Sequence, residues 1–296
     1  MAKSKLKFIL IVIAVIVALV SAVMSSSLNN EAIDESKMFV DFIDVGQGDC
    51  TLIRTEDAVI LIDGGEAGEA DVVINHLKEN GVAKIDCCIA THPHSDHIGS
   101  LADVLNEFDI DTVIMPEIPE DIIPTTRTYE NFLDSVDANA RNVYPAVAGE
   151  TYEYGELKLE ILGPTKDYDD LNLMSVVAKV SYGDTSVMLT GDTEIQAEND
   201  MLAYEYGYES SVDIFSADIL KVAHHGSSTS TSDEWLYLVG PEYAVISCAL
   251  DNSYGHPHKE TIKKLEKNNI EYYRTDLIGT ISFESDGNKF TLIENK

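Results

Sequence analysis

Residues 91–99 read Thr-His-Pro-His-Ser-Asp-His-Ile-Gly, and they constrain the fold of this chain more than any other feature. Three histidines and one aspartate fall within six positions, directly after the apolar run 85–90 and directly before the amphipathic stretch 98–108. Imidazole and carboxylate groups are the ligands that zinc and similar metal ions prefer. The pattern predicts a buried strand, a loop that carries metal ligands, and a helix. His92 and His94 can face one ion, and Asp96 and His97 a second.

Three more segments place a ligand-type side chain directly after an apolar run, which is where a strand would end. They are Asp63 before Gly64-Gly65, Asp192 after Gly191, and the pair His224-His225 before Gly226. An aspartate at a strand end is, by itself, more often a turn residue or a helix cap than a ligand. Together with residues 91–99, the three segments indicate a metal site that is assembled from several strand ends.

Strand-like and helix-like segments alternate from residue 38 onward. Apolar or alternating runs predict strands at 38–44, 50–54, 58–62, 85–90, 112–115, 157–162, 175–182, 186–189, 219–223 and 243–246, and near Tyr272, Ile281 and Phe290. Amphipathic periodicity predicts helices at 71–80, 98–108, 129–139, 194–206, 233–238 and 258–267. Strand meanders that are interleaved with single helices indicate an α/β fold in which two sheets pack face to face with helices outside.

The four cysteines, Cys50, Cys87, Cys88 and Cys248, lie in apolar, strand-like runs. Because successive side chains of a strand point to opposite faces, the neighbours Cys87 and Cys88 cannot easily form one local clasp. We therefore expect all four to be buried as small apolar side chains.

The chain resembles the metallo-β-lactamase superfamily in an ordered set of motifs: Asp-Gly-Gly at 63–65, His-x-His-x-Asp-His at 92–97, Gly-Asp at 191–192 and His-His-Gly at 224–226. Within that superfamily it is similar to the soluble domain of ComEC-type competence proteins, the DNA-uptake channels. This likeness lies in Val-Gly-Gln-Gly-Asp at 45–49, Ser-Asp-His-Ile-Gly at 95–99, Lys-Val-Ala-His-His-Gly-Ser at 221–227, Tyr-Gly-His-Pro-His at 254–258 and Tyr-Arg-Thr-Asp at 273–276. A similar domain occurs in surface phosphorylcholine esterases. The resemblance, which spans roughly residues 38–290, implies an αββα sandwich of two packed mixed β-sheets with helices on the outer faces.

The resemblance also implies a role for each residue that matches the family's motifs. Two divalent metal ions, zinc or alternatively manganese, would be bound by His92 and His94 at the first site and by Asp96, His97 and His225 at the second, with Asp192 between them. Asp63 would be an outer carboxylate that orients the ligand loop. Asp96 would also orient the attacking water or take up its proton. His225 precedes the glycine as the family's last histidine does, which leaves His224 to contact the substrate phosphate.

One departure from the family pattern concerns the first metal site. Most members carry a further metal-binding histidine before the bridging aspartate, and this chain has no histidine between positions 97 and 224. The corresponding stretch, 170–175, is similar to the ComEC type. The first site would then be completed by water, His256, His258 or Asn172, although His258 has an alternative role at the start of a helix. Residues expected around the metals or against the substrate are Asp63, Asn172, Ser175, Ser227 and His256.

The charge balance bears on the substrate. The chain has 20 Lys and Arg against 52 Asp and Glu, a formal net charge of −32. This charge argues against a protein that grips nucleic acid through its phosphates, whereas the family resemblance points towards nucleic acid. We expect a hydrolase of phosphodiesters that acts on extracellular nucleic acid or on a cell-envelope polymer such as teichoic acid. The alternative is a non-catalytic extracellular binding module on the same fold. Nothing indicates a protein partner.

The N-terminus predicts export. Lys3, Lys5 and Lys7 precede an apolar run that extends from residue 8 to about residue 24. A basic head before such a run is typical of a signal peptide or an N-terminal membrane anchor. We therefore expect this segment at 1–24, a polar linker at 25–37 and the hydrolase domain at 38–296. The basic side would stay in the cytoplasm, so the domain would be extracytoplasmic, either secreted or anchored to the membrane.

Overall fold

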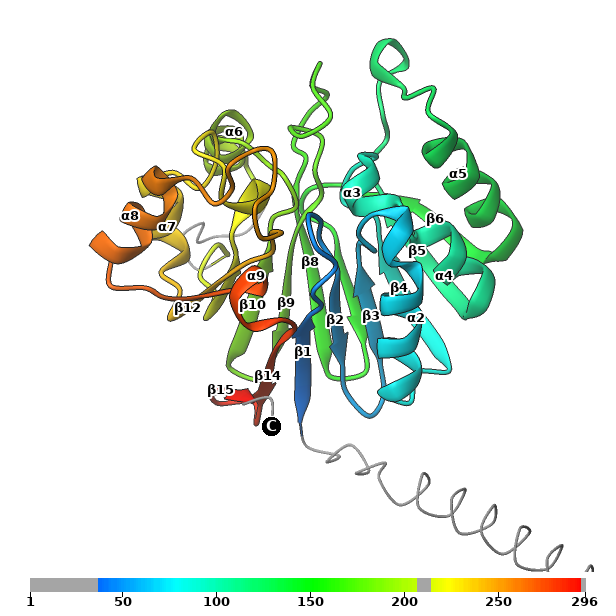
Figure 1. Cartoon of the computed structure of the whole chain (residues 1–296), viewed down its shortest axis with the longest axis horizontal. Coiled ribbons are helices and arrows are strands. Elements are labelled where there is room, and N and C mark those ends of the chain that lie inside the picture. Colours follow the sequence, from blue (N-terminus) through cyan, green and yellow to red (C-terminus); the bar gives the residue numbers. More distant parts are fainter. Residues whose placement is uncertain (1–36, 207–213, 294–296) are drawn as a thin grey trace, which may run out of the picture. The chain divides into compact units, whose positions relative to one another are not determined.

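Two mixed β-sheets form the centre of the computed structural model, which describes residues 37–206 and 214–293 (Figure 1). The first sheet has eight strands in the order β15-β14-β1-β2-β3-β4-β5-β6. Its strands are β1 Met38–Phe42, β2 Thr51–Arg54, β3 Val59–Ile62, β4 Lys84–Ile89, β5 Asp109–Met115, β6 Ala140–Pro145, β14 Ile281–Ser285 and β15 Phe290–Ile293. The second sheet has seven strands in the order β13-β12-β11-β10-β9-β8-β7. Its strands are β7 Thr151–Tyr154, β8 Leu157–Gly163, β9 Val177–Tyr182, β10 Thr185–Leu189, β11 Ile219–Lys221, β12 Tyr243–Ile246 and β13 Glu271–Arg274.

Parallel strands in both sheets bring the expected ligand loops to shared edges. Strands β3 to β6 run parallel to one another, and so do β10 to β13. The carboxyl ends of parallel strands lie at the same edge of a sheet, which is where open α/β sheets bind ligands. The loops after β3 and β4 therefore lie together in one sheet, and the loops after β10 and β11 lie together in the other.

Helices cover the outer face of each sheet (Figure 1). The first sheet is covered by α2 Ala70–Glu79, α4 Leu101–Glu107 and α5 Arg127–Asn139, with the short α3 Ser95–Ile98 at its edge. The second is covered by α6 Ile195–Ala203, α7 Asp233–Val239 and α8 Lys259–Lys267. The remaining helical turns are η1 Ala67–Glu69, η2 Glu120–Ile122, η3 Ala223–Gly226 and α9 Thr275–Ile278. Apolar faces such as Val73 and Leu77 of α2 pack on the sheet beneath them.

The main core lies between the two sheets. Alternate residues of β1, namely Met38, Val40 and Phe42, are fully buried in it. Leu159 and Ile161 of β8 enter the same cluster from the other sheet. Because side chains alternate along a strand, each sheet presents one apolar face to the other sheet and a second to its helices. This arrangement is the αββα sandwich that the sequence predicts.

The cysteines follow the same alternation. Cys87 lies in the core between the sheets, and its neighbour Cys88 lies in the cluster beneath the helices. All four cysteines are buried and free. The expectation that they are buried apolar side chains is confirmed.

The predicted signal peptide or anchor at 1–24 lies outside the described residues, as does the predicted linker except for Lys37. The part that the structure describes contains no helix that is long and apolar enough to cross a membrane. The described residues all belong to one unit, Glu35–Lys296.

Candidate metal centre

The ligand loop after β4 makes backbone contacts with the loop between β1 and β2. The backbone N–H of Asp49 donates to the carbonyl of Asp96 at 3.1 Å. A side chain at Gly48 would collide with that same carbonyl, so only glycine allows the two loops to approach so closely. The ligand loop is therefore fixed by backbone contacts before any ion binds.

Asp63, which the sequence predicts to orient the ligand loop, contacts two residues of that loop. Its Oδ1 accepts from the backbone N–H of Thr91 at 2.8 Å, and its Oδ2 accepts from the Thr91 hydroxyl at 2.7 Å. Asp63 Oδ2 also lies 2.7 Å from His97 Nδ1. An outer carboxylate of this kind sets the tautomer of a metal-binding histidine and turns its other nitrogen towards the ion. His97 Nε2 consequently faces the ligands from the second sheet.

Four side chains from three loops converge on one point, which we call the second metal site: Asp96, His97, Asp192 and His225. One ligand atom of each lies within 4.8 Å of the others. His97 Nε2 lies 3.2 Å from Asp192 Oδ1. His225 Nε2 lies 3.5 Å from that oxygen and 3.3 Å from Asp96 Oδ2. Tetrahedral zinc with bonds of about 2.0–2.1 Å separates its ligand atoms by about 3.3 Å, so these spacings suit one ion.

The hydrogen bonding around this point also fits a cation. The atoms His97 Nε2, His225 Nε2 and Asp192 Oδ1 are buried, and none has a hydrogen-bond partner. His97 Nε2 and His225 Nε2 lie 3.2 Å and 3.5 Å from Asp192 Oδ1, within ion-pair distance but without hydrogen-bond geometry, and one cation among the three atoms would bond them all. The opposite nitrogen of His225 lies 2.9 Å from the Ser247 carbonyl and can donate to it, which leaves Nε2 free as a ligand. The donor set therefore fits a divalent metal ion.

The pKa values of the predicted ligands are shifted in both directions: the shifts at His92 and Asp192 favour the deprotonated form that binds a metal, and the shift at His97 opposes it. Burial lowers the pKa of His92 well below its ordinary value, and the charge of His97 lowers it further, so the imidazole of His92 is neutral, as a metal ligand must be. Burial raises the pKa of Asp192, but His225 and His97 outweigh it and hold that pKa well below its ordinary value. Burial lowers the pKa of His97, yet Asp192 and Asp63 raise it well above its ordinary value. Metal binding at His97 would release a proton.

The turn η3 places the two adjacent histidines at different depths. Both have positive φ, 52° for His224 and 53° for His225, a strained conformation that clusters at functional sites. His225 is buried at the second metal site. The side chain of His224 is 21% exposed, with Nε2 3.7 Å from Asp192 Oδ2 and Nδ1 3.4 Å from Glu194 Oε1. This arrangement supports the prediction that His225 is the ligand, and it leaves His224 in the lining of the adjacent cavity.

The first metal site has fewer protein ligands than the second. His92 Nε2 lies 3.0 Å from His94 Nδ1 and 4.0 Å from Asp192 Oδ2. The stretch 170–175, which lacks the further histidine, ends at Ser175, whose hydroxyl accepts from the Asp192 backbone N–H at 3.1 Å. Ser175 thus positions the backbone of the bridging aspartate. Asn172 Oδ1 is buried, has no partner and belongs to the cavity lining, which supports Asn172 as a further ligand or as a substrate contact.

The remaining predicted residues have different surroundings. His256 lines the cavity, and its Nδ1 is buried without a hydrogen-bond partner. His258 is the N-cap residue of α8. Its Nδ1 accepts a hydrogen bond from the Ser228 backbone N–H at 2.9 Å, and its Nε2 lies 3.3 Å from the carbonyl oxygen of Tyr254. These contacts favour its alternative role at the start of a helix. The Ser227 hydroxyl accepts from Thr229 N–H at 3.3 Å within the turn after the histidine pair, and Ser227 is not part of the cavity lining.

Both metal sites open into a cavity of about 270 Å³. Its lining consists of Gln47, His94, Ser95, Asp96, Asn172, Asp192, His224, His225, Tyr254 and His256. Sequence reasoning did not identify Gln47, Ser95 or Tyr254 as site residues. Gln47 and Tyr254 lie in sequence motifs that carry the family resemblance, and this position in a motif could have identified them as site residues.

Sequence reasoning also missed a buried ion pair behind His225. Lys221 Nζ lies 2.6 Å from Asp49 Oδ2, and Asp49 Oδ1 lies 3.4 Å from His225 Nδ1. Both charged side chains are almost fully buried. A lysine inside the apolar run 219–223 was the signal that could have indicated this pair.

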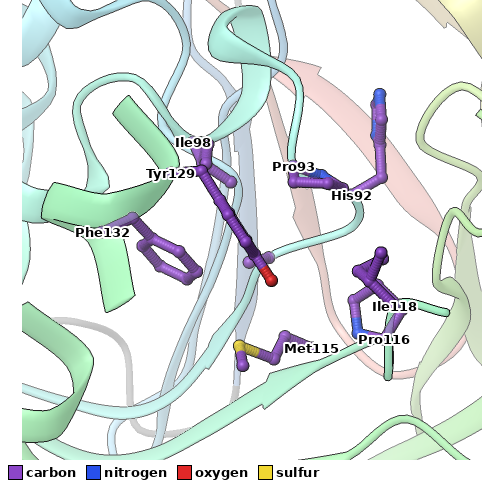
Figure 2. A pocket seen from close by; sticks show the side chains of 9 residues that line it. His92, Pro93, Ile98, Met115, Pro116, Ile118, Tyr129 and Phe132 are labelled. Atoms are coloured by element: carbon purple, nitrogen blue, oxygen red, sulfur yellow. The ribbon is translucent and has the colours of Figure 1, made fainter. Parts of the chain in front are cut away.

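A small apolar pocket lies on the other side of the ligand loop (Figure 2). The imidazole of His92 points away from the space between Tyr129, Met115 and Ile118. The pocket has a volume of about 10 Å³, enough for about one water molecule. Its apolar side chains pack against the ligand loop, whereas most of the predicted metal ligands line the larger cavity.

Known proteins resemble this chain in sequence and in fold. The model of the metallo-beta-lactamase superfamily matches residues 43–249, so the chain belongs to that superfamily. The metallo-beta-lactamase fold protein YhfI from Bacillus subtilis has a similar structure, with a TM-score of 0.54 and 15% sequence identity, over 84% of this chain and 100% of that one. This likeness confirms the fold.

Two curated relatives confirm the resemblance to ComEC-type competence proteins. ComE operon protein 3 of Bacillus subtilis (strain 168) is 29% identical over 264 residues, 82% of this chain and 32% of that protein. Competence protein ComA of Neisseria gonorrhoeae is 30% identical over 260 residues, 87% of this chain and 34% of that protein. The chain thus spans about a third of the length of these relatives. Ribonuclease Z of Mycolicibacterium paratuberculosis (strain ATCC BAA-968 / K-10) is 28% identical over 173 residues, 53% of this chain and 60% of that enzyme.

Proposed function

We propose that this protein is a metal-dependent hydrolase that cleaves phosphodiesters with a metal-activated water. The observation that carries the proposal is the convergence of four ligand atoms, three of them buried without a hydrogen-bond partner, at the mouth of a cavity. Membership of the metallo-β-lactamase superfamily supports a hydrolase, and the likeness to a ribonuclease supports a phosphodiester substrate.

The residues around the cavity have complementary roles in this proposal. A divalent ion at these ligands supplies a nucleophile at neutral pH, because it lowers the pKa of a coordinated water. Asp96 lines the cavity with a side chain that is 23% exposed, so it can orient the water and take up its proton. His224, beside Asp192, can donate a hydrogen bond to a phosphate oxygen as negative charge develops there.

The shared carboxylate favours phosphodiester over amide hydrolysis. Asp192 Oδ1 belongs to the second metal site, and its Oδ2 faces His92 of the first. Two ions held by these residues would supply positive charge for both the attacking and the leaving oxygen at phosphorus. The sparse first site argues against β-lactam hydrolysis. The substrate we propose is nucleic acid or a phosphodiester of a cell-envelope polymer.

The test is hydrolysis of bis-p-nitrophenyl phosphate by the full chain with zinc or manganese added. Asp192→Ala and His97→Ala should each lower the turnover by at least about 10³-fold, since each removes a ligand. Asp41→Asn is the matched control, because Asp41 is equally buried but contacts Arg54 and His76 away from the cavity. Turnover that persists in Asp192→Ala would contradict the proposal. Bound metal without turnover of any phosphodiester would favour the non-catalytic binding module.

We also propose that the domain acts outside the cytoplasm. The proposal rests on the basic head and apolar run of residues 1–24. Fusion of alkaline phosphatase after the last residue of the chain tests it in a bacterial host, because that reporter is active only when exported. An inactive fusion that accumulates in the cytoplasm would contradict it.

A further inference from the structure

Tyr254 is an exposed aromatic side chain that the proposed chemistry does not use. It lies in the loop between β12 and α8 and is 65% exposed, yet it belongs to the lining of the cavity with the metal ligands. Single exposed aromatic residues are common on protein surfaces. Tyr254 differs because its position is set by ring contacts that lead to the metal site.

Three near-parallel rings connect solvent with the second metal site. The rings of Tyr254 and His256 are stacked with centroids 5.6 Å apart and planes 20° apart. The rings of His256 and His225 are stacked in turn, with centroids 6.1 Å apart and planes 26° apart. Offset stacking of this kind is the preferred arrangement of aromatic pairs. Only the ring of His256 therefore lies between the exposed ring of Tyr254 and the predicted metal ligand His225.

The loop that carries Tyr254 is fixed before any ligand binds. The Asn252 amide donates to the carbonyls of Ala249 at 2.9 Å and His256 at 2.6 Å. Its Oδ1 accepts from the backbone N–H of Tyr254 at 3.2 Å and of His256 at 3.0 Å. Gln47, across the cavity, accepts from Ala249 N–H at 3.1 Å. Because these bonds fix the backbone on both sides of Tyr254, ordering the loop costs little entropy when a ligand binds, which favours a role in recognition.

We propose that Tyr254 is a stacking platform for a nucleobase of single-stranded nucleic acid, whose phosphodiester lies at the metal ligands. The inference rests on the proposed function and specifies its substrate class. Every base offers a flat face, so stacking on an aromatic ring binds a strand without a basic track. Such binding is compatible with the net charge of −32, which disfavours a grip on the phosphates of a duplex.

A choline-bearing phosphodiester is the competing occupant. Quaternary ammonium groups are held by cages of several aromatic faces. Within the part of the chain that the structure describes, the lining of this cavity contains one tyrosine, no tryptophan and no phenylalanine. A single open face suits a flat base better than a cation that must be enclosed.

The experiment measures kcat/KM of the full, metal-loaded chain on a short single-stranded oligonucleotide, and on copies with one base at a time replaced by an abasic spacer. Tyr254→Ala should lower kcat/KM roughly 5- to 100-fold on the intact strand, the effect of one stacked base. Tyr254→Phe, which keeps the ring, should restore most of the activity. The loss in Tyr254→Ala should shrink on the one abasic strand that lacks the stacked base. Tyr237→Ala is the matched control, since Tyr237 is 82% exposed on α7 and outside the cavity lining.

Three results would overturn the inference while leaving the proposed function intact. The first is an unchanged kcat/KM in Tyr254→Ala, and the second is an equal loss on every abasic strand. The third is turnover of bis-p-nitrophenyl phosphate or of glycerophosphocholine without turnover of the oligonucleotide. If Tyr254→Ala then lowers the turnover of glycerophosphocholine, the stacking platform binds choline instead of a base. Absence of turnover of all three substrates in the wild type would overturn the proposed function and the inference together.

Discussion

Single residues show how the metal centre is prepared before an ion arrives. Asp63 has a φ of 59°, which aspartate tolerates better than most residues, and its backbone N–H donates to the Ile89 carbonyl of β4. Both of its oxygens are used by Thr91 and His97. One carboxylate thus fixes a strand end, a loop and the tautomer of a ligand.

Asp63→Asn should lower metal affinity by about 10- to 100-fold, the usual effect of losing an outer carboxylate. The new amide would present N–H groups towards His97 Nδ1, so the proton of the ring would move to Nε2 and block the ligand atom. Competition with a chelator of known affinity measures this change. Asp41→Asn, another buried carboxylate, should keep the wild-type affinity; an equal loss in both variants would indicate general destabilisation instead.

The Asp49–Lys221 pair joins the β1–β2 loop of one sheet to β11 of the other. Breaking a buried pair by removing one partner costs about 3–5 kcal/mol, because the other charge is left without compensation. Lys221→Met and Asp49→Asn should each lower the free energy of unfolding by about this amount, and the double variant should lower it by less than the sum of the two. Urea denaturation of the four proteins of this cycle measures the coupling. Additive losses would show that the two side chains do not interact.

At the scale of elements, buried strands were predictable, whereas two of the four edge strands, β6 and β7, were not. The apolar run 58–62 corresponds to β3 and the run 186–189 to β10, because strands that are covered on both faces are continuously apolar. The edge strand β6 was missed, since its residues are mostly exposed and Arg141 pairs with Asp109 and Asp111 at the surface. The edge strand β7 was missed for the same reason. Neither has the apolar pattern by which strands are recognised.

The predicted helix 98–108 corresponds to α4 Leu101–Glu107, and its first residue belongs to the separate short helix α3, Ser95–Ile98. Helix α3 ends at Ile98, and α4 begins at Leu101. Gly99 lies between them, where a side chain would collide with the backbone of Ala67. This contact with the segment after β3 depends on the fold, so a local helical pattern could not reveal it.

Glu198 of α6 links that helix to the start of α7. Its carboxylate is fully buried and accepts from the backbone N–H groups of Thr231 at 2.6 Å and Ser232 at 2.9 Å. Glu198→Ala should lower the free energy of unfolding by about 2–4 kcal/mol, because two donors lose their acceptor in the interior. Glu260→Ala, an exposed glutamate of α8, is the control and should change it by less than about 0.5 kcal/mol. Equal urea midpoints for the two variants would contradict this role.

At the scale of the whole molecule, the sequence predicted the candidate metal ligands more completely than it predicted the residues that line the cavity. His92, His94, Asp96 and His97 were predictable because one short loop carries them. Part of the cavity wall was not, since Gln47 and Tyr254 are brought together only when the two sheets pack. A sequence pattern records the strands that carry ligands, but it does not record which distant loops meet above them.

The net charge of −32 leads to a prediction about salt. A protein that makes 6–10 phosphate contacts loses about 10³–10⁵ in affinity between roughly 50 and 200 mM salt. If the chain holds a strand by metal coordination and stacking, the Michaelis constant for a single-stranded oligonucleotide should change less than about 3-fold over this range, because few counterions are released. Steady-state cleavage at both salt concentrations measures it. An increase of about 100-fold or more in this constant would reveal a basic track and contradict this mode of binding.

The most direct test of the account is the metal content of the full chain after dialysis with zinc, measured by inductively coupled plasma mass spectrometry. We expect the wild type and His224→Ala to retain metal, because His224 is placed towards the substrate. His225→Ala should lose the ion at the second metal site, because the buried Nε2 of His225 is one of its ligand atoms. A wild type without metal, or loss of the ion in His224→Ala but not in His225→Ala, would contradict the proposed centre.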